Sequence, residues 1–278
     1  MSTAQFYSPG HADSDLNRYL GFTYPEIGPD GVVARQDPTQ CGRDGERSDR
    51  VDSRALLAVT DHVMGLALHA ALALKAPLAT VELKMEHLAP LEPGPVFIRT
   101  LAAPLSSHLA FVTARLDQGD ARRTVGYASA RFMVGAWPGG GAAAFPPPLD
   151  TPVDLSGIVD FSSFAGLPAA DDPAVAFEIM ARERLVGARA VPAFHGGIVG
   201  AGLQTVAINL ARRERGADAR LVSLSIDYGR AALATEPIKL EARVIRGGRR
   251  SLRILATARQ GDDRVVSEAQ ALFVVEGA

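Results

Sequence analysis

The feature that most constrains the fold of this chain is an internal duplication. The segment Gln118-Gly119-Asp120 recurs 142 positions later as Gln260-Gly261-Asp262. Leu83, in the run VELKMEHL, matches Leu224, in the run VSLSIDYG, at a separation of 141 positions. Each match is short, but their common order and spacing favour a tandem repeat over chance. The chain is therefore expected to fold as two copies of one unit.

A segment without helical or strand periodicity separates the two copies. The run WPGGGAAAFPPPLD combines glycine, alanine and proline, which is the composition of a linker. We therefore expect a first repeat over residues 18–136, a linker over 137–150 and a second repeat over 151–278. The length of 278 residues suits one or two domains of roughly 150 residues.

Both repeats show the same order of predicted elements. A long apolar helix is expected at about 53–75 in the first repeat and at about 197–213 in the second. Three or four strand-like runs follow each helix, and in the second repeat they lie near 220–228, 238–246, 251–259 and 265–275. An apolar helix followed by an antiparallel meander predicts an α+β fold in which a sheet wraps around a central helix.

The first predicted helix contains a carboxylate in an apolar setting. Asp61 lies in the run AVTDHVMGLALHAALALK, where most neighbours are apolar. Burying a charge costs free energy unless the charge is paired or used. Ala58 and Gly65 share the helical face of Asp61, and both are small. Asp61 is therefore a candidate functional residue that faces open space. The alternative is a structural carboxylate that is capped by backbone or paired with an arginine.

The second repeat contains His195-Gly196-Gly197 directly before its predicted helix. This segment resembles the His-Gly-Gly loop of hotdog acyl-CoA thioesterases of the phenylacetate-pathway type. In that family an acidic residue lies nine positions after the histidine, where this repeat has Gln204. The same frame places Asp61 at the acidic position of the first repeat and Asp52-Ser53-Arg54 at its loop position. One repeat thus keeps the acid and the other keeps the glycine loop.

The resemblance implies a double hotdog with one complete site between the repeats. In many relatives the loop of one subunit faces the acid of the other, so Asp61 would face the loop of the second repeat. Asp61 would act as general base or nucleophile, two roles that the sequence leaves open. The Gly196 amide, at a helix N-terminus, would donate to the oxyanion. His195 would shape the loop, and Thr80 would help to hold the water or the acid.

Four further residues are candidate contacts for the substrate. Gly197, Gly65 and His62 lie near the predicted catalytic groups in sequence. Arg246 lies in the basic run RVIRGGRRSLR and is a candidate for the phosphates of coenzyme A, although a solvated basic hairpin is the alternative. The substrate would be an acyl-CoA, and no separate cofactor is expected.

Three functions are compatible with these residues. The first is an acyl-CoA thioesterase. The second is a non-catalytic hotdog protein that binds acyl-CoA or an acyl chain, a reading motivated by Gln204 and Asp52-Ser53-Arg54. The third is a hotdog dehydratase or hydratase, which needs a matched Asp–His pair. Asp61 and His62 are adjacent, so their side chains diverge by about 100° around a helix, which disfavours the third function.

Charge and cysteine content argue against other classes. The net charge of −2 gives no overall attraction to nucleic acid or to an anionic membrane surface. The single cysteine, Cys41, cannot form an intrachain disulfide and fits a reducing compartment. The N-terminal sequence lacks the apolar core of a secretory signal, and no run approaches the roughly 20 apolar residues of a membrane span. We expect a cytoplasmic homo-oligomer of double-hotdog chains.

A metal site is not expected. His62 and His69 are seven residues apart, or about 10 Å along a helix, and cannot readily share one ion. No cluster of cysteine and histidine occurs elsewhere in the sequence.

Overall fold

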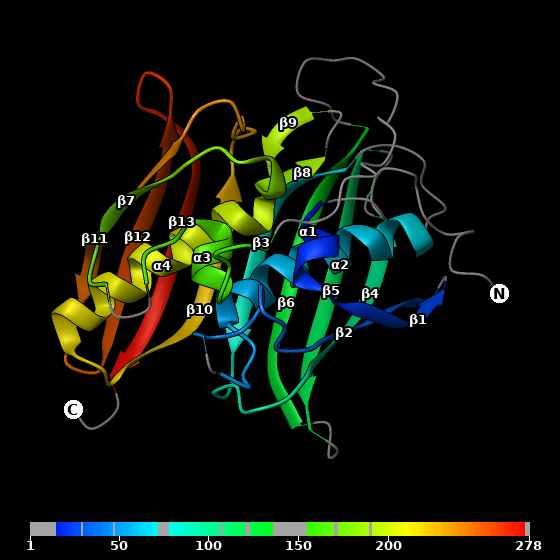
Figure 1. Cartoon of the computed structure of the whole chain (residues 1–278), viewed down its shortest axis with the longest axis horizontal. Coiled ribbons are helices and arrows are strands. Elements are labelled where there is room, and N and C mark those ends of the chain that lie inside the picture. Colours follow the sequence, from blue (N-terminus) through cyan, green and yellow to red (C-terminus); the bar gives the residue numbers. More distant parts are fainter. Residues whose placement is uncertain are drawn as a thin grey trace.

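The structure of the chain is a computed structural model. It describes residues 15–28, 30–46, 48–71, 78–104, 106, 108–119, 123–135, 155–169, 172–188 and 191–275. The expected linker, 137–150, lies outside these residues. Within them, the chain forms one 11-stranded sheet, a small two-stranded sheet and two long helices (Figure 1).

Each half of the chain contributes one long helix and a set of strands. The first half contains α1 (Asp15–Leu20), β1 (Thr23–Gly28), β2 (Gly31–Gln36), α2 (Ser53–Ala71), β3 (Leu78–His87), β4 (Val96–Pro104), β5 (Leu109–Gln118) and β6 (Arg123–Val134). The second contains α3 (Phe161–Ala165), β7 (Ala176–Ile179), a 3₁₀ turn (Glu183–Leu185), β8 (Val186–Ala188), β9 (Val191–Phe194), α4 (Gly196–Arg215), β10 (Ala219–Tyr228), β11 (Ile238–Gly247), β12 (Ser251–Gln260) and β13 (Arg264–Val275).

The strand order is the same in both halves of the large sheet. It runs β1-β2-β4-β5-β6-β3-β10-β13-β12-β11-β7, and neighbouring strands are antiparallel. The strand that follows the long helix, β3 or β10, lies at the centre, and a strand from the segment before that helix, β2 or β7, lies toward the edge. The first half has an additional edge strand, β1. Lys84 on β3 pairs with Ser225 on β10, and these residues are 141 positions apart. The two halves of the sheet therefore join between β3 and β10, at a pair of residues that occupy matching positions in the two halves of the sequence.

The predicted strands of the second half lie within one residue of β10, β11, β12 and β13 at each end. Alternation contributes to this agreement, because buried residues alternate with exposed ones over parts of these strands. In β12, for example, Leu252, Ile254 and Ala256 are buried and Arg253 is exposed. The helix expected at 53–75 is α2, which ends at Ala71; residues 72–77 lie outside the described part of the chain.

Both long helices lie on one face of the sheet. Figure 1 shows α4 in front of β11, β12 and β13, and α2 in front of the green strands β5 and β6. Every residue of α2 from Arg54 to Ala70 is buried, which explains why the sequence of this helix is apolar on nearly every face. None of the helices in the described ranges has the length and apolar character needed to cross a membrane.

The two helices approach each other closely at the start of α4. A Cβ atom on Gly197 would lie 2.4 Å from the Cα of Ala58 in α2, so only glycine fits at this crossing. The contact brings the N-terminal end of α4 against the middle of α2. It therefore places the residues that precede α4 next to the centre of the first half's helix.

Candidate active site

A cavity of about 540 Å³ lies where the two halves meet. Its walls come from α2, β3 and β6 of the first half and from β8, β9, α4, β10, the segment 229–232 and β13 of the second. Asp61 from α2 and His195-Gly196 from the start of α4 both line it. Residues that lie 134 positions apart in sequence, Asp61 and His195, are thus brought to one cavity.

Asp61 is buried and held by a neighbouring hydroxyl. Its side chain lies in the cavity wall with a residue exposure of 4%, and Thr80 Oγ1 on β3 donates a hydrogen bond to Asp61 Oδ1 at 2.9 Å. Burial raises the pKa of Asp61. The nearby imidazole of His195 and hydrogen bonds from Thr80 and the Gly197 amide act in the opposite direction and favour the carboxylate. Burial therefore disfavours the ionised form of Asp61, while three neighbouring groups stabilise it.

His195 fixes the start of α4. It is the N-cap residue of the helix, and its Nδ1 accepts a hydrogen bond from the Gly197 amide at 3.0 Å. The same Nδ1 lies 3.6 Å from Asp61 Oδ2. Because Nδ1 already accepts from an amide, it carries no proton, and this pair is a close approach and not a hydrogen-bonded ion pair. Burial lowers the pKa of His195, with Asp61 acting in the opposite direction.

Gly196 leaves the carboxylate accessible. A Cβ atom on Gly196 would lie 3.0 Å from Asp61 Oδ2 and 3.7 Å from Thr80 Oγ1. A larger residue would therefore fill the space directly above the acid. Gly196 is the first residue of α4, where backbone amides have no partner within the helix and the helix dipole favours negative charge.

Tyr228 is a part of the site that sequence reasoning missed. It ends β10, lines the cavity, and donates a hydrogen bond from its hydroxyl to the Gly196 carbonyl at 2.9 Å. Burial, with a further contribution from the charge of Asp61, raises the pKa of Tyr228 well above its usual value, so the phenol stays protonated. The only signal in the sequence was a polar aromatic residue at the end of a predicted central strand.

We expect Tyr228→Phe to hold the His195-Gly196 loop less firmly, while its phenyl ring still fills the same part of the cavity wall. The variant removes one hydrogen bond, so the free energy of unfolding should fall by about 1 kcal/mol and turnover by about tenfold. Denaturant unfolding and steady-state kinetics would measure both. The matched control is Tyr127→Phe, since Tyr127 is 47% exposed on β6 and is not among the cavity residues. Equal effects of the two variants would contradict a positioning role for Tyr228.

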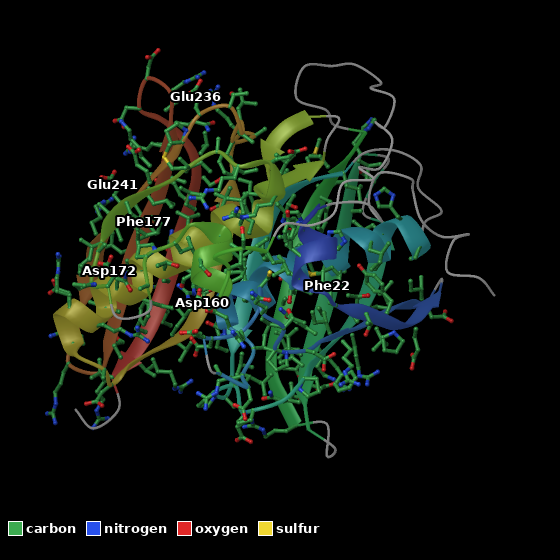
Figure 2. The ribbon with its side chains drawn as sticks, viewed as in Figure 1. Phe22, Asp160, Asp172, Phe177, Glu236 and Glu241 are labelled. Atoms are coloured by element: carbon green, nitrogen blue, oxygen red, sulfur yellow. The ribbon has the colours of Figure 1, made fainter. Side chains whose placement is uncertain are left out.

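The structure brings some of the other predicted contacts to the cavity. His62 and Gly65 line it. The His62 ring stacks on His195 at a centroid distance of 5.8 Å, and it meets the edge of Phe22, labelled in Figure 2, at 5.3 Å. Gly197 is not among the lining residues; it serves the close contact with Ala58 and donates its amide to the site.

Arg246, a predicted contact for the phosphates of coenzyme A, lies away from this cavity. Arg246 lies near the end of β11, where it pairs with Arg253 and does not line the cavity. A Cβ atom on the next residue, Gly247, would lie 3.3 Å from Arg215, the last residue of α4. The 20 residues of α4 span about 30 Å, so Arg246 lies at the opposite end of this helix from Gly196.

A second, smaller cleft lies where Ser53 at the start of α2 faces α4. Gln204 Nε2 donates a hydrogen bond to Ser53 Oγ at 3.1 Å. The contact between Gln204 and Ser53 thus corresponds to the contact between Asp61 and Gly196 in the larger cavity. Arg54 pairs with Asp52 at 2.6 Å and also donates to Ser162 Oγ at 2.9 Å. The space left is about 100 Å³. Polar contacts fill this cleft, and the position equivalent to Asp61 carries a neutral amide.

Metal ligands do not gather in the described ranges, where no group of three or more His, Cys, Asp or Glu side chains could hold an ion. Cys41 is buried, and burial raises the pKa of its thiol to about 11. A thiol with so high a pKa is a poor nucleophile at neutral pH.

Comparisons with known proteins bear on the second half of the sequence and on the fold. A family model described as the acyl-CoA thioesterase N-terminal domain matches residues 188–274, which hold the His195-Gly196 loop, α4 and the strands that follow. No curated protein matches the chain in sequence.

Solved structures show the fold. The chain superposes on the tesB protein of Mycobacterium avium subspecies paratuberculosis with a TM-score of 0.58 and 10% identity, over 95% of this chain and 99% of that one. It is similar to the 12:0-ACP thioesterase from Umbellularia californica, with a TM-score of 0.55 and 10% identity, over 87% of this chain and 93% of that one. It is also similar to an acyl-ACP thioesterase from Bacteroides thetaiotaomicron, with a TM-score of 0.54 and 10% identity, over 93% of this chain and 99% of that one.

These likenesses define the class of protein by its fold. The chain has a hotdog-like α+β fold of the kind found in thioesterases. Its C-terminal part, which carries the glycine loop, also matches an acyl-CoA thioesterase domain in sequence.

Proposed function

We propose that this chain is a thioesterase that hydrolyses acyl-CoA at one composite site between two tandem hotdog repeats. The observation that carries the proposal is the meeting of Asp61 from the first half with Gly196 from the second, where a Cβ would lie 3.0 Å from the carboxylate. The common strand order of the halves and the matching pair Lys84 and Ser225 support the repeat. The subtype most similar in motif is the phenylacetate-pathway thioesterase.

The chemistry of thioester hydrolysis fits these groups. Asp61 Oδ1 is held by Thr80, so Oδ2 is the atom that faces the opening above Gly196. As a base, Oδ2 takes a proton from the water that attacks the carbonyl carbon; as a nucleophile, it attacks that carbon itself. The amide at the start of α4 donates to the oxyanion that forms. When Asp61 acts as base, the carbon–sulfur bond then breaks and the coenzyme A thiolate leaves with the proton that Asp61 accepted. When Asp61 acts as nucleophile, the same bond breaks to leave a mixed anhydride on Asp61; water then hydrolyses the anhydride, restores the carboxylate and supplies the proton for the thiolate. Both routes need Asp61 as the carboxylate.

A pH profile follows from this requirement. Burial raises the pKa of Asp61 above the ordinary value of 3.8, and only the ionised form is active. We expect kcat/KM to rise with pH through the raised pKa and to reach a plateau above it. Initial rates across the acid range, with folding checked by circular dichroism, would measure the profile. Full activity at pH 4 in the folded protein would contradict the assignment.

An assay for released thiol over a panel of acyl-CoA esters tests the proposed function itself. Turnover of at least one ester that Asp61→Asn abolishes is expected. Binding of acyl-CoA without any release of thiol would instead identify a non-catalytic binding protein. A homo-oligomeric assembly, a cytoplasmic location and independence from a metal or separate cofactor stay predictions from the sequence.

A further inference from the structure

The residues that line the cavity fall into two groups along the sheet order β6-β3-β10-β13, and we call these two groups its arms. The β3–β6 arm is lined by Leu78, Ala79, Phe132 and Met133, and no charged side chain lines it. The β10–β13 arm is lined by Gly229, Arg230, Ala231, Ala232 and Ser267, with Ala193 and Phe194 from β9. Because β3 and β10 are adjacent in the sheet, Asp61 and Gly196 lie between the arms.

Ser267 gives the β10–β13 arm an unused polar group. It lies on β13 directly opposite Tyr228 on β10, so both side chains point to the helix side of the sheet. Ser267 is 2% exposed, and its Oγ has no hydrogen-bond partner among the described residues. Buried hydroxyls normally have a hydrogen-bond partner, so an unpaired one in a cavity wall is available to a water molecule or to a polar group of a ligand.

Arg230 places a cation at the outer end of the same arm. Its side chain is exposed and lines the cavity, and its backbone amide donates to Val266, the neighbour of Ser267. Its guanidinium makes no ion pair and no hydrogen bond within the described part of the chain. An unpaired arginine at a cavity mouth is suited to a phosphate, which it binds through charge-assisted hydrogen bonds.

We propose that the substrate lies across the catalytic groups in one direction, with the acyl group in the β3–β6 arm and the pantetheine in the β10–β13 arm. Ser267 then pairs with a pantetheine amide, and Arg230 binds a phosphate of coenzyme A. This inference rests on the proposed function and adds the orientation of the substrate and the residues that select its carrier.

The Arg230 part is tested with two thioesters of one acyl group, an acyl-CoA and the acyl-N-acetylcysteamine ester, which lacks the phosphates. Arg230→Gln should raise KM for the acyl-CoA about tenfold, leave kcat unchanged and change neither constant for the truncated ester. Arg243→Gln, at an exposed arginine on β11 outside the cavity, is the matched control. An unchanged KM for acyl-CoA, or equal effects on both esters, would overturn this assignment.

The direction of the substrate is tested by narrowing each arm separately. Ala79→Leu fills the β3–β6 arm and should lower kcat/KM about tenfold or more for long acyl chains while sparing short ones. Ala231→Leu fills the other arm and should affect acyl-CoA esters equally, whatever their chain length. The reverse pattern would show that the substrate lies the other way. An Ala79→Leu protein that does not fold is replaced by Ala79→Val in the same comparison.

Ser267→Ala separates a binding role from a structural one. The variant removes a buried, unsatisfied hydroxyl, so its unfolding temperature should equal or exceed that of the parent protein, while KM rises about threefold or more for both esters. A fall in stability with unchanged KM would assign Ser267 to the fold. Wild-type protein that hydrolyses neither ester would refute the proposed function, whereas normal hydrolysis that none of these variants alters would refute the orientation alone.

Discussion

Replacement of Asp61 by asparagine is expected to lower turnover by about 10²-fold or more while the chain stays folded, which is the scale of losing a positioned base. Asparagine keeps the size of the side chain and can still accept from Thr80, but its amide cannot take a proton or attack a carbonyl at neutral pH. Steady-state release of thiol would measure the loss. A folded variant with undiminished turnover would remove Asp61 from the mechanism.

The same variant should be at least as stable as the parent protein at neutral pH. Burial raises the pKa of Asp61, so the folded state disfavours the ionised form, and the stability of the parent protein falls as pH rises through that pKa. Asparagine does not ionise and escapes this cost. Urea unfolding at pH 4 and pH 8 would show a difference between variant and parent that favours the variant more at the higher pH. If Asp61→Asn were less stable than the parent protein at pH 8 but not at pH 4, the carboxylate would stabilise the fold, which contradicts this prediction.

Gly196→Val should reduce turnover by at least about 10²-fold, because the new side chain meets Asp61 Oδ2 and Thr80 Oγ1 where the substrate carbonyl must lie. The matched variant in the other half is Ser53→Val, because Ser53 lines the smaller cleft. It removes the hydrogen bond with Gln204 and should cost about 1–3 kcal/mol of stability while largely sparing turnover. Activity that depends on Ser53 and not on Gly196 would show that the halves are paired wrongly.

The sequence allowed much of the fold to be predicted because the relevant information is local. Alternation of apolar residues located β10 to β13, and the apolar run around Asp61 located α2. The opening of the first half was harder, since β1 and β2 form a hairpin at the edge of the sheet with little alternation in β1. Edge strands carry less burial pattern than central strands, so periodicity identifies them poorly.

Some residues of the candidate site could be predicted from the sequence, and others could not. The meeting of Asp61 with His195 and Gly196 was implied by the resemblance to hotdog thioesterases, in which the loop of one subunit faces the acid of the other, and both sides line one cavity. Tyr228 and Ser267 could not, because their importance comes from facing each other across β10 and β13 and from pointing toward the start of α4. Arg246 was nominated from a basic run, whose position in space the sequence does not reveal.

The most direct test of the composite site is the stoichiometry of binding. Titration of the chain with an unhydrolysable acyl-CoA analogue, followed by isothermal calorimetry, measures the number of sites per chain. The geometry predicts one site per chain, lost in Gly196→Val and retained in Ser53→Val, because Gln204 and Arg54 occupy the second cleft. Two equivalent sites per chain, or a site that survives Gly196→Val unchanged, would contradict the account.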